Sequence, residues 1–288
     1  MRDFTKDHQW LSINTATIKK QWSLDKIIDE CAKRNIRAIS PWRDQVAAVG
    51  IDKISKQLKS HSIQLSGYCR GGFYPASDSK GIQAAHDDNR LAIDEAKKLN
   101  APCLVLVVGS LPGALQGRAQ YKDVELARSQ VFDGIAKALE YAVQVGMPLA
   151  IEPLHPMQAA ERACINTTEH ALDICDALDP QRKGHLGIAL DVYHTWWDPK
   201  LKEQIQRAGK DRLLAFHVCD WLTPTRDLLN DRGMMGDGII EIQKIRGWVE
   251  AAGYDQFSEV EIFSDLNWWN KPGEEVLDTC IARHRSSV

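Results

Sequence analysis

The sequence predicts an α/β fold, a single (β/α)8 TIM barrel domain over residues 1–288, and three observations support this prediction. First, an apolar run rich in β-branched residues, a polar loop and a segment of helical periodicity follow one another eight times. Second, most of the apolar runs are nearly continuous, such as CLVLVVG and LLAFHV, as in parallel strands covered on both faces. Third, no linker rich in Pro, Gly or Ser divides the chain, and one α/β barrel reaches about 250 residues. An open, doubly wound sheet is the alternative.

The first four strand–helix units occupy the N-terminal half. The predicted strands are 10–15, 36–40, 63–68 and 102–108, and each precedes a helix, at 23–33, 51–60, 82–99 and 124–145 respectively. Ser23 stands directly before the first helical pattern, where a hydroxyl can accept a hydrogen bond from a free backbone N–H. The strands are short apolar runs, and the helices show apolar residues at spacings of three and four.

The last four units continue the same order. The predicted strands are 148–152, 185–192, 213–218 and 258–263, and the helices that follow them are 168–177, 199–208, 242–252 and 272–282. Because a helix separates each pair of successive strands, the strands are expected to be parallel and to end at the same side of the barrel.

Composition and charge exclude several classes of protein. Lys and Arg number 36 against 39 Asp and Glu, a net charge of −3, whereas a general nucleic-acid binder normally has a basic surplus. The longest uncharged stretch, 101–117, is interrupted by Gly and Pro and falls short of the roughly 20 apolar residues that span a bilayer. The N-terminus has no apolar signal-peptide core, and the seven cysteines are scattered without a CxxC pair. We therefore expect a cytoplasmic protein without nucleic-acid or membrane partners.

Acidic residues and histidines stand at the ends of the last four strands. The ends read IEPLHP, ALDVYH, FHVCDW and EVEIFS, which carry Glu152 and His155, Asp191 and His194, His217 and Asp220, and Glu259 and Glu261. In a TIM barrel the chemistry lies where strands end and βα loops begin. The steps 152 to 191, 191 to 217 and 217 to 261 each correspond to about one βα unit.

Glu152, Asp191, His217 and Glu261 can therefore converge from four strands and bind one divalent metal ion. A single acidic residue at a strand end is usually a helix cap or an ion-pair partner. Several clustered carboxylates repel one another unless a cation neutralises them. Three carboxylates and one imidazole form an oxygen-rich ligand set, so Mn²⁺ is the expected ion, with Mg²⁺ or Co²⁺ as alternatives. Zinc, which prefers nitrogen and sulfur ligands, is less favoured.

The series EPLHP, DVYHTWWD, FHVCDW, DRGMMGDG and EVEIFS resembles the xylose isomerase-like barrel superfamily. Within it, the chain is most similar to the sugar isomerase and epimerase branch that includes ketose 3-epimerases. The βα order covers the whole chain, and the specific motifs lie in its C-terminal half. In that family a Glu, an Asp, a His and a Glu bind one divalent metal, at positions that match Glu152, Asp191, His217 and Glu261.

The resemblance also implies roles in catalysis. The two glutamates that match Glu152 and Glu261 exchange a proton with the carbon beside a carbonyl, through an enediolate, which gives a metal-dependent sugar epimerase or aldose–ketose isomerase. The family's substrate-binding histidine matches His194. Its arginine resembles Arg232, which stands several residues further along. His155 is a departure, because ketose epimerases do not typically carry histidine there.

Further residues near strand ends are candidates for substrate binding. Arg70, in GYCRGG, can bind a carboxylate or hydroxyl group, or can form a surface ion pair. Trp42 and Trp197 can stack on the C–H faces of a sugar, or can simply cap the barrel. The expected partner is a small sugar or sugar-derived substrate, and the resemblance implies a homo-oligomer.

Three other functions stay open. The chain can be a metal-dependent lyase that acts on a keto sugar or sugar acid by β-elimination or decarboxylation, with His155 as the base. It can be a sugar-binding protein without catalysis, although such a protein has little need for both glutamates. An endonuclease of the abasic-site type ranks last, because such enzymes need more histidine ligands, and the first four strand ends offer none.

Overall fold

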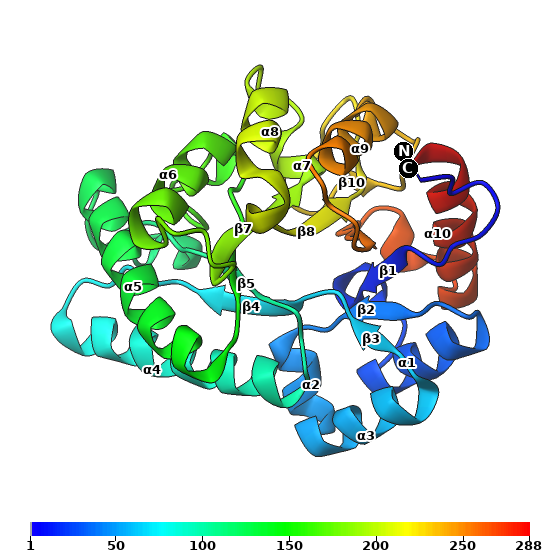
Figure 1. The fold of residues 1–288 in the computed structure, drawn as a ribbon, viewed down its shortest axis with the longest axis horizontal. Coiled ribbons are helices and arrows are strands. Elements are labelled where there is room, and N and C mark those ends of the chain that lie inside the picture. The colour runs from blue at the N-terminus through cyan, green and yellow to red at the C-terminus, as the bar shows by residue number, and fades with distance from the viewer. Residues whose placement is uncertain (1) are drawn as a thin grey trace.

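The computed structural model describes residues 2–288, and its centre is a curved sheet of nine parallel strands (Figure 1). The strands are β1 Leu11–Asn14, β2 Ala38–Ser40, β3 Gln64–Leu65, β4 Tyr68–Gly72, β5 Leu104–Val107, β6 Leu149–Ile151, β7 Leu186–Asp191, β8 Leu213–Val218 and β11 Ser258–Val260. Their order is β3-β2-β1-β11-β8-β7-β6-β5-β4. The two outermost strands, β3 and β4, are successive pieces of the third barrel strand, separated only by Ser66 and Gly67, so the sheet closes on itself. The predicted (β/α)8 barrel is confirmed.

The third barrel strand differs from its predicted range of 63–68. It breaks after Leu65 and resumes at Tyr68, and the β4–β5 register shifts between Cys69 and Gly71. Arg70 is therefore the extra residue of a β-bulge, a feature that redirects a side chain. The predicted range ends at Tyr68, whereas β4 continues to Gly72 through an arginine and two glycines, residue types that are not typical of a strand interior.

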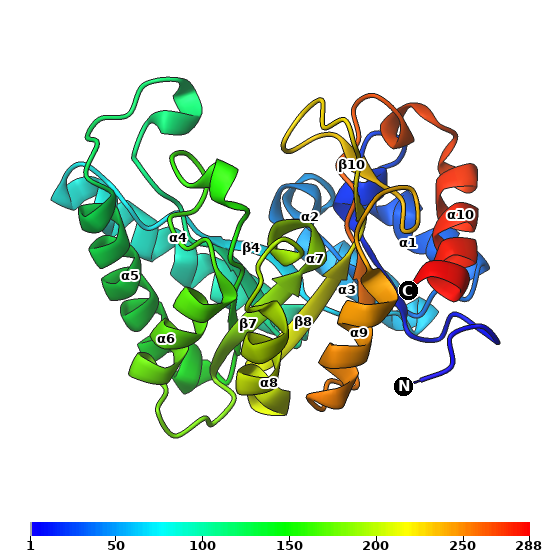
Figure 2. The same ribbon diagram turned by 90° about the horizontal axis from the view of Figure 1, so that it is seen from above.

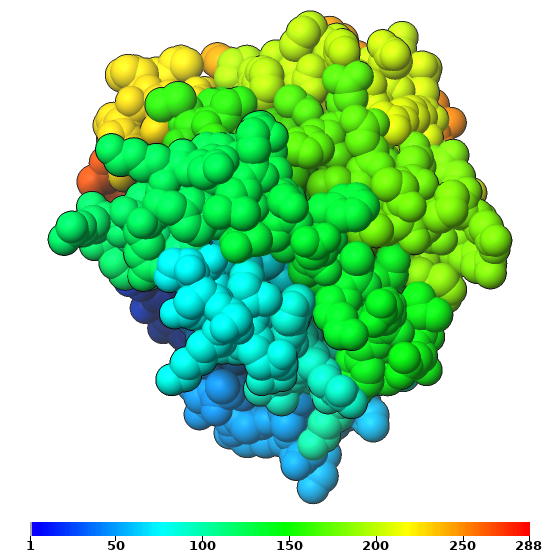
Figure 3. Space-filling model, turned by 90° about the vertical axis from the view of Figure 1, so that its left-hand side faces the viewer, coloured from blue at the N-terminus to red at the C-terminus, as the bar shows by residue number. Residues whose placement is uncertain are grey.

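A ring of helices surrounds the sheet (Figure 1). Figure 3 shows one side of the outer surface, where the cyan, green and yellow-green parts of the chain lie next to one another. The helices that follow the eight barrel strands are α1 Leu24–Lys33, α3 Ile51–His61, α4 Ser79–Lys98, α5 Val124–Val145, α6 Thr168–Leu178, α8 Leu201–Arg212, α9 Ile242–Ala251 and α10 Gly273–Ser287. These match the predicted helices to within a few residues. The sequence did not reveal α2 Arg43–Val49, which is too short to show helical periodicity. In the part of the chain described, no helix is both long and apolar enough to cross a membrane.

The N-terminal segment packs against the last helix. The ring of Phe4 stacks on His284 with centroids 4.6 Å apart, and Arg285 donates two hydrogen bonds to the Thr5 carbonyl. The main core is apolar and contains five of the seven cysteines, and a second, smaller cluster of residues from the strands contains Cys69 and Cys103. All seven cysteines are buried and unpaired.

The loops at the carboxyl ends of the strands are the most elaborate part of the fold. They contain the antiparallel pair β9 Asp220–Trp221 and β10 Arg232–Gly233, the one-turn helix α7 Val192–Thr195, and the short 3-10 helices η1 Thr15–Ile18, η2 Ala114–Gln116, η3 Pro156–Gln158 and η4 Trp268–Asn270. Figure 2 shows the loop that contains η2 and the loop that carries β10 rising at the same end of the barrel. The predicted site residues lie at this end.

Candidate functional site

The four predicted metal ligands come together at the carboxyl ends of four adjacent strands. Glu152 directly follows β6, Asp191 ends β7, His217 lies in β8 and Glu261 directly follows β11. Asp191 and His217 are partners in the β7–β8 register. All four side chains are buried, and one ligand atom from each lies within 4.8 Å of the others. The barrel therefore gathers three carboxylates and one imidazole around one point.

The free atoms of this cluster fit a cation. Oε1 of Glu152 lies 3.0 Å from Nδ1 of His217, yet both atoms are buried and neither has a hydrogen-bond partner in the structure. Buried polar atoms are normally satisfied, and an unsatisfied one calls for an explanation such as an ion. An oxygen and a nitrogen lone pair that face the same point, beside two more carboxylates, form a suitable ligand set for a divalent metal.

Burial and the neighbouring carboxylates together set the pKa values of the cluster. Burial raises the pKa of Glu152, and it raises the pKa of Asp191 to about 7. For His217, burial alone would lower the pKa, but the charges of Glu259, Glu152 and Glu261 raise it well above its ordinary value. Without a metal, the cluster therefore holds protons that a bound cation would displace.

Arg232 spans two of these carboxylates from the loop after β8. Its Nη1 lies 3.0 Å from Oδ2 of Asp191 and 3.0 Å from Oε2 of Glu261. The guanidinium is buried over the ring of Tyr193, 4.5 Å from the centroid. Burial would lower its pKa, but Asp191 and Glu261 raise that pKa well above the ordinary value. A permanent cation thus lies beside the ligand set, on the side that faces the cavity.

His194 is held next to Asp191 by the single turn of α7. Oδ1 of Asp191 accepts the backbone N–H of Tyr193 and caps this turn, which leaves Oδ2 for the cluster. Nδ1 of His194 accepts the backbone N–H of His155, and Nε2 lies 3.1 Å from Nη2 of Arg232. Burial lowers the pKa of His194 well below its ordinary value, so the ring is neutral.

Glu259 supports the cluster from behind, and sequence reasoning assigned it no role. Its Oε1 lies 3.4 Å from Nε2 of His217, on the far side of the ring from Glu152. The carboxylate also accepts hydrogen bonds from Asn14 and Ser66 at 2.8 and 2.7 Å. The signal was present in EVEIFS, because residues two apart in a strand point to the same face.

A cavity of about 220 Å³ opens above Glu152 and Glu261. Of the predicted substrate-binding residues, Trp42, Arg70, His194 and Arg232 line it. It is also lined by two cations that sequence reasoning missed, Lys19 after η1 and Arg162 in the loop after β6.

His155 and Trp197 lie outside the residues that line this cavity. The imidazole of His155 stacks on Trp221, with centroids 4.8 Å apart, and its Nδ1 accepts the backbone N–H of Met157. Trp197 packs edge-on against His155 and donates a hydrogen bond to the His194 carbonyl. His155 and Trp197 therefore pack against each other and support His194, through the backbone N–H of His155 and the indole N–H of Trp197.

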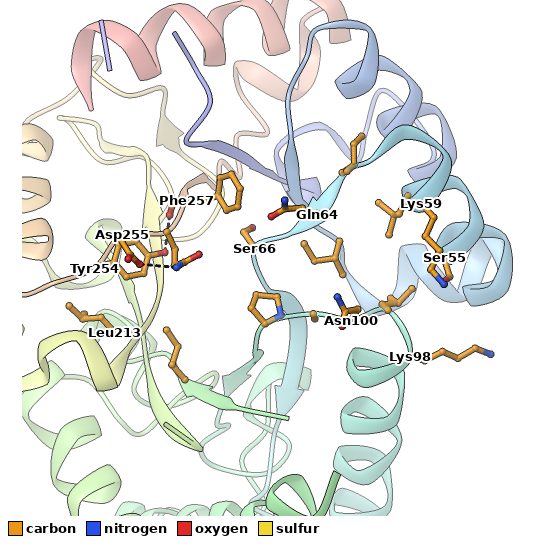
Figure 4. Close-up of a pocket in the computed structure, with 18 of the residues that line it drawn as sticks. Ser55, Lys59, Gln64, Ser66, Lys98, Asn100, Leu213, Tyr254, Asp255 and Phe257 are labelled. Atoms are coloured by element: carbon orange, nitrogen blue, oxygen red, sulfur yellow. Dashed lines mark hydrogen bonds between the residues drawn. The ribbon is translucent and has the colours of Figure 1, made fainter. Parts of the chain in front are cut away.

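A larger cavity, about 820 Å³, lies at the opposite end of the barrel (Figure 4). Residues that begin strands or precede them line it, such as Gln64, Leu213 and Phe257. Two of its lysines are already paired, Lys98 with Asp52 at 2.7 Å and Lys210 with Asp255 at 3.5 Å. The catalytic candidates are thus at the smaller cavity, in keeping with the usual location of chemistry in TIM barrels.

The chain belongs to the xylose isomerase-like TIM barrel family, whose model matches residues 28–282. This confirms the resemblance deduced from the strand-end motifs. No curated protein matches the chain in sequence.

Solved structures share the fold over nearly the whole chain. Protein SMc04130 from Sinorhizobium meliloti 1021 is 52% identical, with 97% of this chain and 98% of that chain covered and a TM-score of 0.92. The IolI protein, solved with a bound zinc atom, is 20% identical, with 94% of each chain covered and a TM-score of 0.79. A D-allulose 3-epimerase from Methylomonas sp., in complex with D-allulose, is 17% identical, with 98% of this chain and 96% of that chain covered and a TM-score of 0.73. Structural neighbours of the chain thus include a ketose 3-epimerase.

Proposed function

We propose that this protein is a divalent-metal-dependent sugar epimerase or isomerase that moves a proton at a carbon next to a carbonyl. The observation that carries the proposal is the pair Glu152 and Glu261, which belong to one metal-ligand cluster and line one cavity. They follow β6 and β11, with β8 and β7 between them, so they approach the cavity from two sides. Two carboxylates so arranged can remove a proton from one face of a substrate carbon and return it to the other.

The surrounding residues suit the two glutamates to this task. The pKa of Glu152 is raised by burial, which brings a carboxyl group closer to the range in which it can both accept and release a proton at neutral pH. Glu261 accepts hydrogen bonds from Arg232 and Asn14, each at 3.0 Å, which fix the orientation of its carboxylate. A divalent ion bound by the cluster would supply positive charge that stabilises an enediolate. Mn²⁺ is the ion we propose, with Mg²⁺ and Co²⁺ as alternatives.

Arg232 and His194 would orient the substrate oxygens. The guanidinium of Arg232 can only donate hydrogen bonds and is always positively charged, so it would stabilise a substrate oxygen that becomes negative. His194 is neutral and lies 3.1 Å from Arg232, within reach of the same oxygen. Trp42 offers an aromatic wall, and Asn14 holds its indole N–H at 2.8 Å.

Proton exchange tests this function. Incubation of the Mn²⁺-loaded protein in D₂O with ketoses, aldoses and 3-keto sugars should place deuterium on a carbon next to a carbonyl, visible by NMR, together with a new epimer or isomer. Glu152→Gln and Glu261→Gln should each lower the exchange rate by at least about 100-fold. Glu241→Gln, which changes a glutamate whose side chain is 70% exposed, is the matched control and should keep the wild-type rate. Wild-type exchange in both cavity variants would refute the two-carboxylate mechanism.

A further inference from the structure

Three cations line the substrate cavity in addition to Arg232. Lys19 comes from the end of η1, Arg70 from the bulge in β4, and Arg162 from the loop that follows η3. They therefore reach the same cavity of about 220 Å³ from three separate barrel units.

These three cations have almost no carboxylate partners. In residues 2–288, neither Lys19 nor Arg70 has an ion pair or a side-chain hydrogen bond. Arg162 has a single distant contact, Nε to Oε1 of Glu161 at 3.8 Å. That Nε is buried and has no hydrogen-bond partner.

Aromatic rings hold two of the cations in place of acids. The guanidinium of Arg70 lies 4.1 Å from the ring centre of Phe73, and the ammonium of Lys19 lies 4.8 Å from that of Phe263. Burial lowers the pKa of both groups, so their charges are incompletely compensated. The carboxylate of Asp44 raises the pKa of Lys19 and of Arg70 in part, but it lies beyond ion-pair distance from both. Desolvated cations without partners are unfavourable, and a bound anion would relieve that cost.

The charge balance of the site leaves these cations uncompensated. When deprotonated, Glu152, Asp191 and Glu261 carry three negative charges, and Arg232 carries one positive charge, which leaves a net charge of −2. A divalent ion would neutralise the remaining two. Glu259 does not line the cavity and is already bonded to Asn14 and Ser66. The positive charges of Lys19, Arg70 and Arg162 would then face the substrate with only the more distant carboxylates of Asp44 and Glu161 to oppose them.

We infer that the substrate is a small organic anion, with a carboxylate or phosphate group held by Lys19, Arg70 and Arg162. This inference rests on the proposed function, because it places the reacting carbon of the same molecule between Glu152 and Glu261. The cavity volume is below the 300–1,000 Å³ of typical ligand pockets, which favours a compact acid over a glycoside. Planar guanidinium groups bind such oxyanions with two hydrogen bonds, which fixes the orientation of the ligand.

Binding to matched compounds tests the inference independently of turnover. Within each of two sets, the compounds differ only in the charged group. The first set is dihydroxyacetone (neutral), hydroxypyruvate (a carboxylate) and dihydroxyacetone phosphate. The second is D-fructose (neutral), D-fructuronate (a carboxylate) and D-fructose 6-phosphate. Calorimetry on the Mn²⁺-loaded and metal-free protein should show, in at least one set, an anion that binds at least about tenfold more tightly than its neutral counterpart. Whether the carboxylate or the phosphate binds more tightly identifies the anionic group.

Single-charge variants locate the effect. Arg70→Met, Lys19→Met and Arg162→Gln should each reduce the preference for the anion about tenfold, and a thermal melt of each variant confirms that it is folded. Lys20→Met is the matched control, because Lys20 is an exposed neighbour of Lys19 outside the cavity lining, and it should keep the preference. The inference is overturned if no anionic compound binds, if neutral and anionic compounds bind equally, or if the folded variants retain the full preference.

The proton-exchange experiment separates this inference from the proposed function. Exchange with neutral ketoses, together with no preference for anions, would overturn the inference and leave the function standing. Anion binding that depends on Arg70 and Lys19, without exchange in any bound compound, would support the anion site and contradict the proposed function.

Discussion

Glu152 Oε1 and His217 Nδ1 lie 3.0 Å apart in a buried site, and neither atom makes a hydrogen bond. Glu152 comes from the end of β6 and His217 from β8, so the barrel itself sets this separation. The same two atoms, with Asp191 and Glu261, are the ligands that we propose for a divalent ion.

Metal affinity should fall as the pH is lowered through neutrality. Metal ligands bind in their deprotonated forms, whereas the metal-free site raises the pKa of His217 well above its ordinary value and that of Asp191 to about 7. Protons therefore compete with the ion increasingly below about pH 7. Calorimetric titration with Mn²⁺ from pH 6 to 8, in buffers of different ionisation enthalpy, should show proton release and tighter binding at higher pH. An affinity independent of pH would contradict these shifts.

Glu259 should strengthen metal binding without contacting the metal. It faces Nε2 of His217 at 3.4 Å, and a carboxylate there orients the ring and makes the opposite nitrogen a better ligand. Glu259→Gln is expected to weaken Mn²⁺ binding by about 10–100-fold, measured by calorimetry. Ser66→Ala removes the hydroxyl's hydrogen bonds to Glu259 and Ser12 but keeps the Glu259 carboxylate beside His217, so it should have a smaller effect. Equal affinities in the wild type and Glu259→Gln would show that the contact is purely structural.

Arg232 should matter most for stability when the metal is absent. It bridges Asp191 and Glu261, and its loss leaves two buried carboxylates without this partner. Arg232→Met is expected to lower the free energy of unfolding of the metal-free protein by about 3–5 kcal/mol. Added Mn²⁺ should recover a large part of that loss, because it neutralises the same carboxylates. Chemical denaturation with and without Mn²⁺ measures both values, and a loss that Mn²⁺ leaves unchanged would argue against a shared site.

His284 should make the fold sensitive to acid. Its ring is buried against Phe4, both nitrogens lack partners, and burial lowers its pKa to about 3. Between the unfolded-state value of about 6.5 and pH 3, the unfolded chain binds more protons, so stability falls as the pH is lowered through that window. The loss amounts to on the order of 4 kcal/mol by pH 3. His284→Phe should flatten the pH dependence of denaturation in this window, and an unchanged slope would assign the acid sensitivity to other groups.

The barrel and its four proposed metal ligands could be predicted from sequence because both follow from short-range patterns. The eight apolar runs and the helical periodicities set the order of elements, and the end of each late strand carries an acidic residue or histidine. Parallel strands with helical connections bring those ends to one rim. No knowledge of loop conformation was needed for Glu152, Asp191, His217 or Glu261.

The residues on loops and bulges could not be placed in the same way. Lys19 and Arg162 follow 3-10 helices, whose direction no periodicity reveals, and Arg70 reaches the cavity only because of a bulge. His155 and Trp197 stand near strand ends in sequence, yet their rings pack with Trp221 and His194 outside the cavity lining. Position in sequence locates the rim of a barrel but leaves open which side chains turn inward.

A crystal structure of the Mn²⁺-loaded protein, with anomalous scattering measured at the manganese edge, tests most directly whether Glu152, Asp191, His217 and Glu261 hold one divalent ion. We predict one anomalous peak per chain, within coordination distance of all four side chains. A structure with no peak there, or with the ion bound elsewhere, would contradict the account.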